Sequence, residues 1–206
     1  MPSRPQTPQE ALACLIEGNQ RFVQRRPLHT KISEEVFVSL RESQRPFAVI
    51  LGCSDSRVPP ELVFDQSFGD LFVIRLAGNL IAPGVGGSIQ YAYQHLGTSL
   101  LVVLGHEGCG AVKAALAAKF PRAKHPERIQ QLIQLSEPGL EKIDPKLSAA
   151  KQLEAGVEAN VRWSMHQVSR TREARQAVRR AGSVLIVGAV YELSTGKVRW
   201  LDRCSD

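Results

Sequence analysis

Short, continuous apolar runs recur along this chain and alternate with longer stretches of helical pattern. The runs cover residues 47–51, 71–74, 100–104 and 184–190. Each run is rich in β-branched or aliphatic residues and too short for a buried helix, which is typical of strands covered on both faces. Strands that alternate with helices form a mostly parallel sheet with right-handed crossovers. We therefore predict an α/β fold with a mostly parallel central sheet of about four strands, flanked by helices.

The connecting segments predict the helices and one further strand. Helical patterns cover residues 8–26, 32–45, 88–96, 111–120, 129–135 and 147–180, and residues 78–84 resemble an irregular loop. Thr7 and Glu10 have the spacing of a capping box at the start of the first helix. Residues 194–196 resemble a turn into the short run 198–201, which predicts an antiparallel edge strand. A length of 206 residues suits a single domain, residues 1–206, that begins with a helical arm over residues 1–45.

Composition argues against membrane and nucleic-acid partners. The apolar runs are too short to span a bilayer, and the N-terminus lacks the apolar core of a secretory signal. We expect a cytoplasmic protein, although removal of a signal would leave the same sequence. The net charge of +6 derives partly from arginines in residues 162–180. No nucleic-acid motif or stacking aromatics accompany them, so a solvated helix face is the simpler interpretation.

Two cysteines and a histidine follow the ends of two predicted strands. Cys53 comes after the first apolar run, whereas His106 and Cys109 come after the third. The carboxyl ends of parallel strands lie at one edge of a sheet, where ligands bind. Zinc takes thiolate and imidazole ligands, and a catalytic zinc site usually has three protein ligands. We predict one Zn²⁺ per chain, held by Cys53, His106 and Cys109, and no such role for Cys14 or Cys204.

Asp55 and Arg57 lie two and four residues after Cys53. At this spacing the guanidinium group can hold the carboxylate in a bidentate pair. An unpaired Asp55 could become a fourth zinc ligand, whereas a paired one can accept a hydrogen bond from zinc-bound hydroxide and orient it. We predict catalytic roles for Asp55 and Arg57. The sequence leaves open whether Asp55 sits on Arg57 or on the metal.

At these residues the chain resembles the β-class carbonic anhydrases. The resemblance rests on residues 53–57, Cys-Ser-Asp-Ser-Arg, and on residues 105–110, Gly-His-Glu-Gly-Cys-Gly. It extends through residues 17–22, 72–75, 77–79 and 191–196, and thus covers most of the chain. It implies zinc-dependent, reversible hydration of carbon dioxide to bicarbonate and a proton.

The resemblance also implies an assembly. Members of the family form dimers or multiples of dimers, with the substrate pocket at the subunit interface and the N-terminal helix packed on the partner. By position in the motifs, Gln44, Phe72 and Tyr91 correspond to substrate-binding residues. Ile50 stands where a regulated subgroup has Trp in a noncatalytic bicarbonate pocket, so such a pocket is not expected here.

Other functions compete with this interpretation. A hydrolase of carbon disulfide or carbonyl sulfide would use the same scaffold, because hydroxide attacks those substrates in the same way. A thiol redox protein would use Cys53 and Cys109, but the chain has no Cys-x-x-Cys pair. A nucleobase deaminase would need a Pro-Cys-x-x-Cys segment, which is absent. A noncatalytic zinc site would normally have four protein ligands, and only Asp55 could be the fourth.

Overall fold

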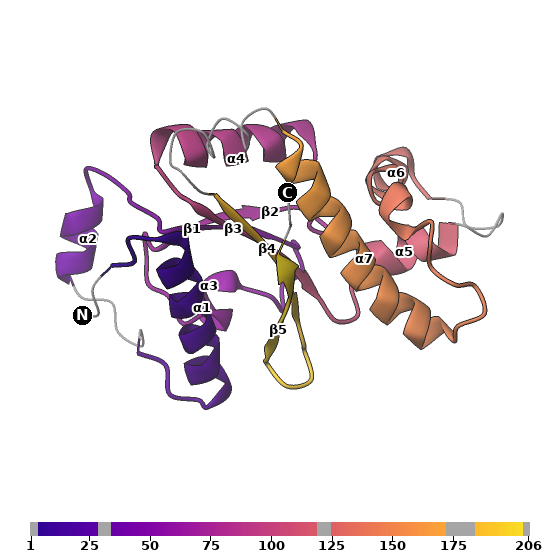
Figure 1. The fold of residues 1–206 in the computed structure, drawn as a ribbon, viewed down its shortest axis with the longest axis horizontal. Coiled ribbons are helices and arrows are strands. Elements are labelled where there is room, and N and C mark those ends of the chain that lie inside the picture. The colour runs from indigo at the N-terminus through magenta and orange to yellow at the C-terminus, as the bar shows by residue number, and fades with distance from the viewer. Residues whose placement is uncertain (1–3, 29–33, 119–124, 172–183, 204–206) are drawn as a thin grey trace.

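The computed structural model of the chain describes residues 4–28, 34–118, 125–171 and 184–203 (Figure 1). The helices are α1 (Pro8–Val23), α2 (Glu34–Leu40), α3 (Pro60–Val63), α4 (Pro83–His95), α5 (Gly110–Ala118), α6 (Glu127–Leu140) and α7 (Ala149–Ser169). The strands are β1 (Ala48–Gly52), β2 (Leu71–Arg75), β3 (Leu100–His106), β4 (Leu185–Tyr191) and β5 (Val198–Arg203). Within these stretches of chain, no helix has both the length and the apolar character needed to cross a bilayer.

The strands form one five-stranded sheet in the order β2-β1-β3-β4-β5. Strands β1 to β4 run parallel, and β5 pairs antiparallel with β4. This arrangement confirms the predicted α/β fold with an antiparallel edge strand. Because β1 and β3 are neighbours, the segments that follow them meet at the same edge of the sheet.

The central strands are buried on both faces, as their continuous apolar runs predict. All residues of β1 and β3 are buried. Side chains of alternate strand residues enter two separate cores, one with Val49 and Leu51, the other with Ala48 and Ile50. Helix α1 packs on the second core, and α4 and α7 lie on the other side of the sheet (Figure 1).

Two helices extend beyond their predicted bounds. Helix α4 begins at Pro83, not at Ser88, because proline suits the first helical position and Val85 already packs in the core. Helix α6 continues through Pro138 to Leu140, which is fully buried. The Cβ atom of Trp163 in α7 lies 2.5 Å from where a side chain at Gly139 would begin. This close contact between α6 and α7 explains why the last turn of α6 persists despite the proline.

Other bounds also differ from prediction. Helix α2 ends at Leu40, before the predicted end at residue 45, and the short helix α3 was not predicted. Residues 32–33 and 119–120 of two predicted helices lie outside the described residues. Helix α7 covers residues 149–169 of the predicted helix 147–180, and residues 172–180 lie outside the described residues. The capping box of α1 is confirmed, since Thr7 Oγ1 accepts a hydrogen bond from the Glu10 backbone N–H and the Glu10 carboxylate accepts one from the Thr7 backbone N–H.

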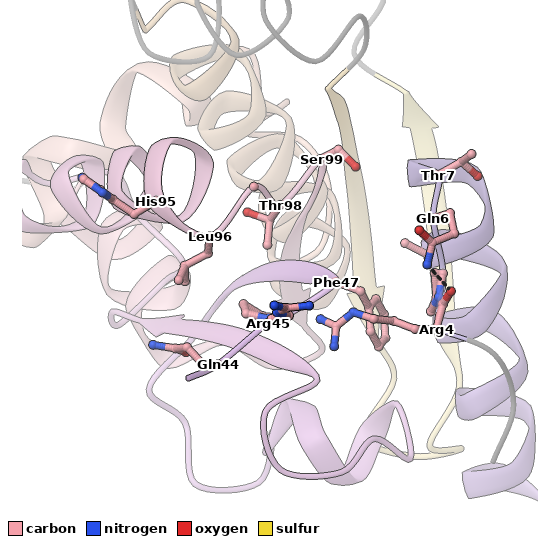
Figure 2. Close-up of a pocket in the computed structure, with 14 residues that line it drawn as sticks. Arg4, Gln6, Thr7, Gln44, Arg45, Phe47, His95, Leu96, Thr98 and Ser99 are labelled. Carbon is pink, nitrogen blue, oxygen red and sulfur yellow. Dashed lines mark hydrogen bonds between the residues drawn. The ribbon is translucent and has the colours of Figure 1, made fainter. Parts of the chain in front are cut away.

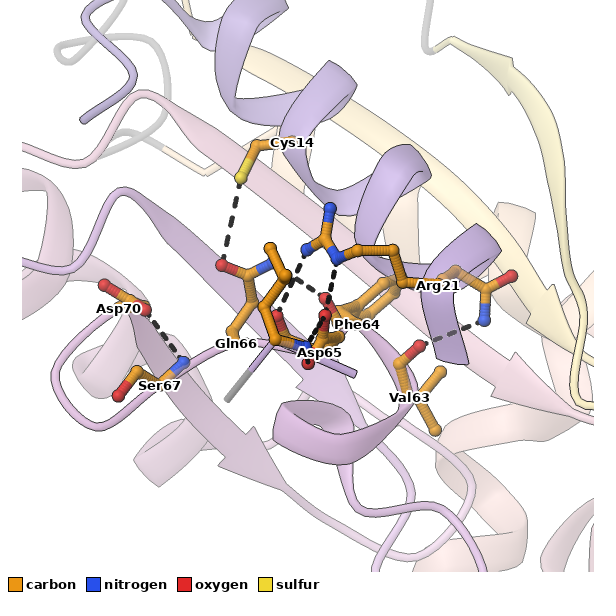
Figure 3. A network of polar contacts seen from close by, with 10 residues as sticks. Cys14, Arg21, Val63, Phe64, Asp65, Gln66, Ser67 and Asp70 are labelled. Atoms are coloured by element: carbon orange, nitrogen blue, oxygen red, sulfur yellow. Dashed lines mark hydrogen bonds and ion pairs between the residues drawn. The ribbon is translucent and has the colours of Figure 1, made fainter. Parts of the chain in front are cut away.

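Helix α1 is attached to α3 and to the β4–β5 turn by polar contacts on one face. Asn19 Nδ2 donates to the carbonyl oxygens of Val63 and Gly196, and Asn19 Oδ1 accepts from the Val198 N–H. Arg21 Nε pairs with the buried carboxylate of Asp65 (Figure 3). Asp65 follows the end of α3, and its backbone has a positive φ of 46°. These contacts fix α3, the first helix after the segment that contains Cys53.

Substituting Gly18 with alanine should destabilise this contact strongly. An added Cβ would overlap the carbonyl group of Phe64, which is backbone and cannot move aside as a side chain can. We expect a loss of about 3 kcal/mol in the free energy of unfolding, and thus a Tm lower by about 6–12 °C. Gly87→Ala is the matched control, because Gly87 lies exposed in α4 with nothing within 4 Å of its Cβ position. Equal melting temperatures for the two variants would contradict this account of α1 packing.

Candidate metal centre

Three candidate ligands meet at the carboxyl edge of the sheet. Cys53 follows directly after β1, His106 is the last residue of β3, and Cys109 immediately precedes α5. Their ligand atoms all lie within 4.8 Å of one another, and all three residues are buried. The two neighbouring parallel strands thus bring together residues that are more than fifty positions apart in the sequence.

The histidine is oriented for metal binding. His106 Nδ1 lies 2.9 Å from the backbone oxygen of Glu107. A carbonyl oxygen can only accept, so Nδ1 carries the proton and Nε2 has a free lone pair. Nε2 is buried and has no hydrogen-bond partner in the part of the chain that the structure describes. An unpaired imidazole nitrogen beside two sulfur atoms fits three of the four positions of a tetrahedral zinc ion.

The two thiols share a proton. A hydrogen bond from Cys109 lowers the pKa of Cys53 to about 4 and raises the pKa of Cys109. The backbone N–H of Gly78 also donates to Cys53 Sγ, at 3.2 Å. Within this pair, hydrogen bonding favours the ionised form of Cys53, and Cys109 must release its proton when a metal binds.

The Asp55 carboxylate is held by Arg57 next to this cluster. Arg57 Nε donates to Asp55 Oδ1 at 2.9 Å, and Arg57 Nη2 donates to Oδ2 at 2.7 Å. These bonds hold the pKa of Asp55 well below its usual range, so the carboxylate is ionised. Asp55 Oδ2 lies 3.8 Å from His106 Nε2. In this structure Asp55 is thus paired with Arg57, the alternative that the sequence left open.

Arg75, the last residue of β2, is a further part of this site that sequence reasoning did not assign. Its Nε donates to the carbonyl oxygen of Cys53 at 3.0 Å, and its Nη2 donates to that of Asp55 at 2.6 Å. The guanidinium group therefore fixes the backbone that carries the Cys53 sulfur and the Asp55 carboxylate. The sequence signal that could have identified Arg75 is its position directly after the second apolar run, residues 71–74.

The three residues predicted to bind substrate lie at two different places in the chain. Gln44 precedes β1 and lies at its amino end, whereas Cys53 follows its carboxyl end. A strand of this length separates them by about 16 Å. Phe72 in β2 and Tyr91 in α4 form a stacked ring pair with a centroid distance of 6.2 Å. Tyr91 is 47% exposed, whereas Phe72 is partly buried and packs against the core.

Gln44 instead lines a cavity of about 460 Å³ at the amino ends of β1 and β3. Figure 2 shows the side chains of Arg4 and Arg45 pointing toward one another. His95, at the end of α4, also lines the cavity and lies apart from the two arginines in this view. It lies at the opposite edge of the sheet from Cys53. The cavity is therefore separate from the candidate metal centre of the same chain.

Cys14 is also remote from the metal centre. Its sulfur lies 3.8 Å from Gln66 Oε1, between α1 and the segment after α3 (Figure 3). Burial raises the pKa of this thiol. Cys204 lies outside the described residues.

Comparison with known proteins identifies relatives across the whole chain. Residues 48–198 match the family described as carbonic anhydrase. The sequence is 38% identical over 201 residues to a carbonic anhydrase of Mycolicibacterium smegmatis, which spans 97% of this chain and 96% of that protein. It is 53% identical to carbonic anhydrase 2 of Mycobacterium tuberculosis over 111 residues, or 54% of each protein.

Solved structures give the same result. The β-carbonic anhydrase of Coccomyxa in complex with acetazolamide has a TM-score of 0.76 at 28% identity, covering 92% of this chain and 86% of that one. A tetrameric β-carbonic anhydrase of Sordaria macrospora has a TM-score of 0.76 at 20% identity, covering 95% of this chain and 100% of that one. The second likeness concerns the fold alone.

Proposed function

Because this chain belongs to the β-class carbonic anhydrase family, we propose that it catalyses the reversible hydration of carbon dioxide to bicarbonate and a proton. Carbon dioxide hydration is the general reaction of that family. The observation that carries the proposal is the buried cluster of Cys53, His106 and Cys109 with the ionised Asp55 carboxylate beside it.

Cys53 Sγ, Cys109 Sγ and His106 Nε2 would hold a zinc ion, in accordance with the unpaired imidazole nitrogen and the preformed thiolate. When bound, zinc supplies a Lewis acid that lowers the pKa of water and so provides hydroxide near neutral pH. The His106 Nδ1 bond to the Glu107 carbonyl keeps the ring turned so that Nε2 faces the two sulfurs.

Asp55 orients the nucleophile. An ionised carboxylate only accepts hydrogen bonds, so Asp55 Oδ2 would accept a hydrogen bond from the O–H of the attacking hydroxide and leave an oxygen lone pair directed at carbon dioxide. Arg57 holds both carboxylate oxygens and balances their charge, which keeps Asp55 from becoming a metal ligand. Arg75 keeps the backbone of this segment in place through the Cys53 and Asp55 carbonyls.

The substrate pocket would form between subunits. Gln44 lies at the opposite edge of the sheet from the metal centre of its own chain, and the exposed ring of Tyr91, stacked on Phe72, is available to a partner. We propose a homodimer, or a dimer of dimers, in which these residues line the partner's pocket. Because one face of α1 packs on the core of its own chain, residues 1–45 would contact the partner through their remaining exposed surface.

A hybrid dimer tests this sharing. In a dimer of one Cys53→Ser chain and one Gln44→Ala chain, purified with two different tags, the intact metal centre would face an intact Gln44 from the other chain. We expect about half of the wild-type activity, the same as for a hybrid of Cys53→Ser with wild type. Activity as low as half that of the Gln44→Ala homodimer would instead assign Gln44 to its own subunit.

The direct test of the proposed function is a carbon dioxide hydration assay on protein of measured zinc content. We expect activity proportional to zinc, which removal by a chelator abolishes and zinc restores. Carbon disulfide and carbonyl sulfide are assayed in parallel on the same preparation. Full activity without metal would contradict the mechanism, and faster turnover of the sulfur compounds would change the substrate. The thiol redox alternative is disfavoured, because both cysteines of the cluster are buried.

A further inference from the structure

We infer that Asn160, in the middle of α7, is a positioning residue for Cys53 and acts on it through the Gly78 backbone. The inference rests on the proposed role of Cys53 as a zinc ligand. Asn160 is fully buried, although asparagine is usually exposed. It lies more than a hundred positions after Cys53 in the sequence, so only the fold relates the two residues.

Two hydrogen bonds join Asn160 to the sulfur atom. Asn160 Nδ2 donates to the Gly78 carbonyl oxygen at 2.7 Å. The Gly78 N–H donates to Cys53 Sγ at 3.2 Å. The carbonyl and the N–H belong to successive peptide groups, which are joined at the Gly78 Cα atom. A shift of the shared Cα atom moves both groups, so holding the carbonyl also holds the N–H that faces the sulfur.

The peptide group between Gly78 and Asn79 is fixed at both of its polar atoms. Asn160 holds its oxygen, and its N–H donates to the Leu76 carbonyl oxygen at 2.8 Å. The turn has a left-handed backbone, with a φ of 77° at Gly78 and 47° at Asn79, conformations that glycine adopts freely and asparagine tolerates. An added Cβ at Gly78 would lie 3.1 Å from Ala111 Cβ, so the turn is closely packed against α5. The Asn160 amide adds a hydrogen bond from α7 to this packing.

The N–H bond matters to the metal centre because it fixes the position of the sulfur and stabilises its negative charge. Groups that hydrogen-bond to metal ligands in this way typically change metal affinity by about 10–100-fold when they are lost. Loss of the Asn160 amide would release the Gly78 carbonyl and allow the turn to relax away from Cys53.

Ser164 provides a matched control on the same helix. It is also fully buried, one turn after Asn160, and its Oγ donates to the Asn79 carbonyl oxygen at 3.0 Å. Ser164→Ala thus removes one buried donor from the same turn but leaves the Gly78 carbonyl paired. The test variant is Asn160→Leu, which keeps the side-chain size and also removes Asn160 Oδ1, an acceptor without a partner in the described part of the chain. Asn160→Ala is the second test variant, in case leucine is not accommodated.

Two measurements other than activity decide the outcome. The first is zinc affinity, from competition between the holoprotein and a chelator. The second is the sulfur-to-cobalt charge-transfer absorption of the Co²⁺-substituted protein, which reports on the metal–thiolate bonds. We expect Asn160→Leu and Asn160→Ala to bind zinc about 10–100-fold more weakly with shifted absorption. Ser164→Ala should melt at a lower temperature but keep its zinc affinity within about twofold of wild type.

Wild-type zinc affinity and absorption in both Asn160 variants would overturn the inference. So would equal losses in Ser164→Ala, because the effect would then be a general loosening of the turn. If the wild-type protein binds neither zinc nor cobalt, the proposed function itself fails, a result distinct from the other two.

Discussion

Replacing Cys53 with serine is expected to abolish both zinc binding and carbon dioxide hydration. A serine hydroxyl is not ionised near neutral pH, whereas hydrogen bonds to Cys53 lower the pKa of its thiol and favour the thiolate that binds metal. The remaining ligands, His106 and Cys109, are too few for a stable site. Zinc per chain, measured by elemental analysis, should fall from about one to near zero, and turnover to the uncatalysed rate.

Cys14→Ser is the control for this substitution. It makes the same chemical change at a partly buried cysteine, but Cys14 contacts Gln66 and not the metal centre. This variant should keep full zinc content and activity. A Cys53→Ser protein that retains zinc and turns over carbon dioxide would contradict the assignment of Cys53, and a metal-free Cys14→Ser protein would show that the effect is not specific to the site.

Asp55→Asn is expected to reduce kcat strongly while zinc remains bound. Asparagine has the same shape but is neutral, and its amide nitrogen cannot accept a hydrogen bond from the attacking hydroxide. It also leaves one guanidinium contact of Arg57 without an acceptor. Losing one such oriented polar contact at the reacting atoms typically lowers kcat by about 10²–10³-fold. Steady-state hydration kinetics together with zinc analysis separate this effect from metal loss.

Asp144→Asn controls for the change in charge. Asp144 lies in the loop after α6 and accepts a hydrogen bond from the Lys146 N–H at the surface. Its variant should have wild-type kcat. If Asp55→Asn retained wild-type kcat with full zinc, Asp55 would have no part in orienting the nucleophile. The Asp55–Arg57 contact would then be an ordinary surface ion pair.

The strands and the ligand cluster were predictable because their signals are local. An apolar run such as residues 100–104 is typical of a buried strand in a parallel sheet. Residues directly after two such runs lie close together when the strands are neighbours. This is why the sequence alone predicted that His106 and Cys53 lie at the same site. Their placement within 4.8 Å of Cys109 is what that reasoning predicts, while zinc binding itself remains a prediction.

Helix bounds were less predictable where tertiary contacts outweigh local propensity. Pro138 should end α6, yet the helix continues because Gly139 packs against Trp163 and Leu140 enters the core. Similarly, the glycines in the first turns of α4 have low helix propensity, so the sequence did not predict that the helix begins at Pro83. Neither contact can be read from the residues within a few positions of the helix end.

The amino-acid order alone predicts the candidate ligands, the proximity of Asp55 and Arg57, and the parallel sheet, since each depends on neighbouring residues and on the rule that parallel strands end at one edge. The folded chain adds what depends on distant segments. It pairs Asp55 with Arg57 beside His106, places Arg75 on the Cys53 backbone, and separates Gln44 from the metal centre of its own chain. It also brings Asn160 to Gly78. Such contacts arise only when helices and strands far apart in the sequence pack together, because no local pattern encodes which buried polar group will meet which.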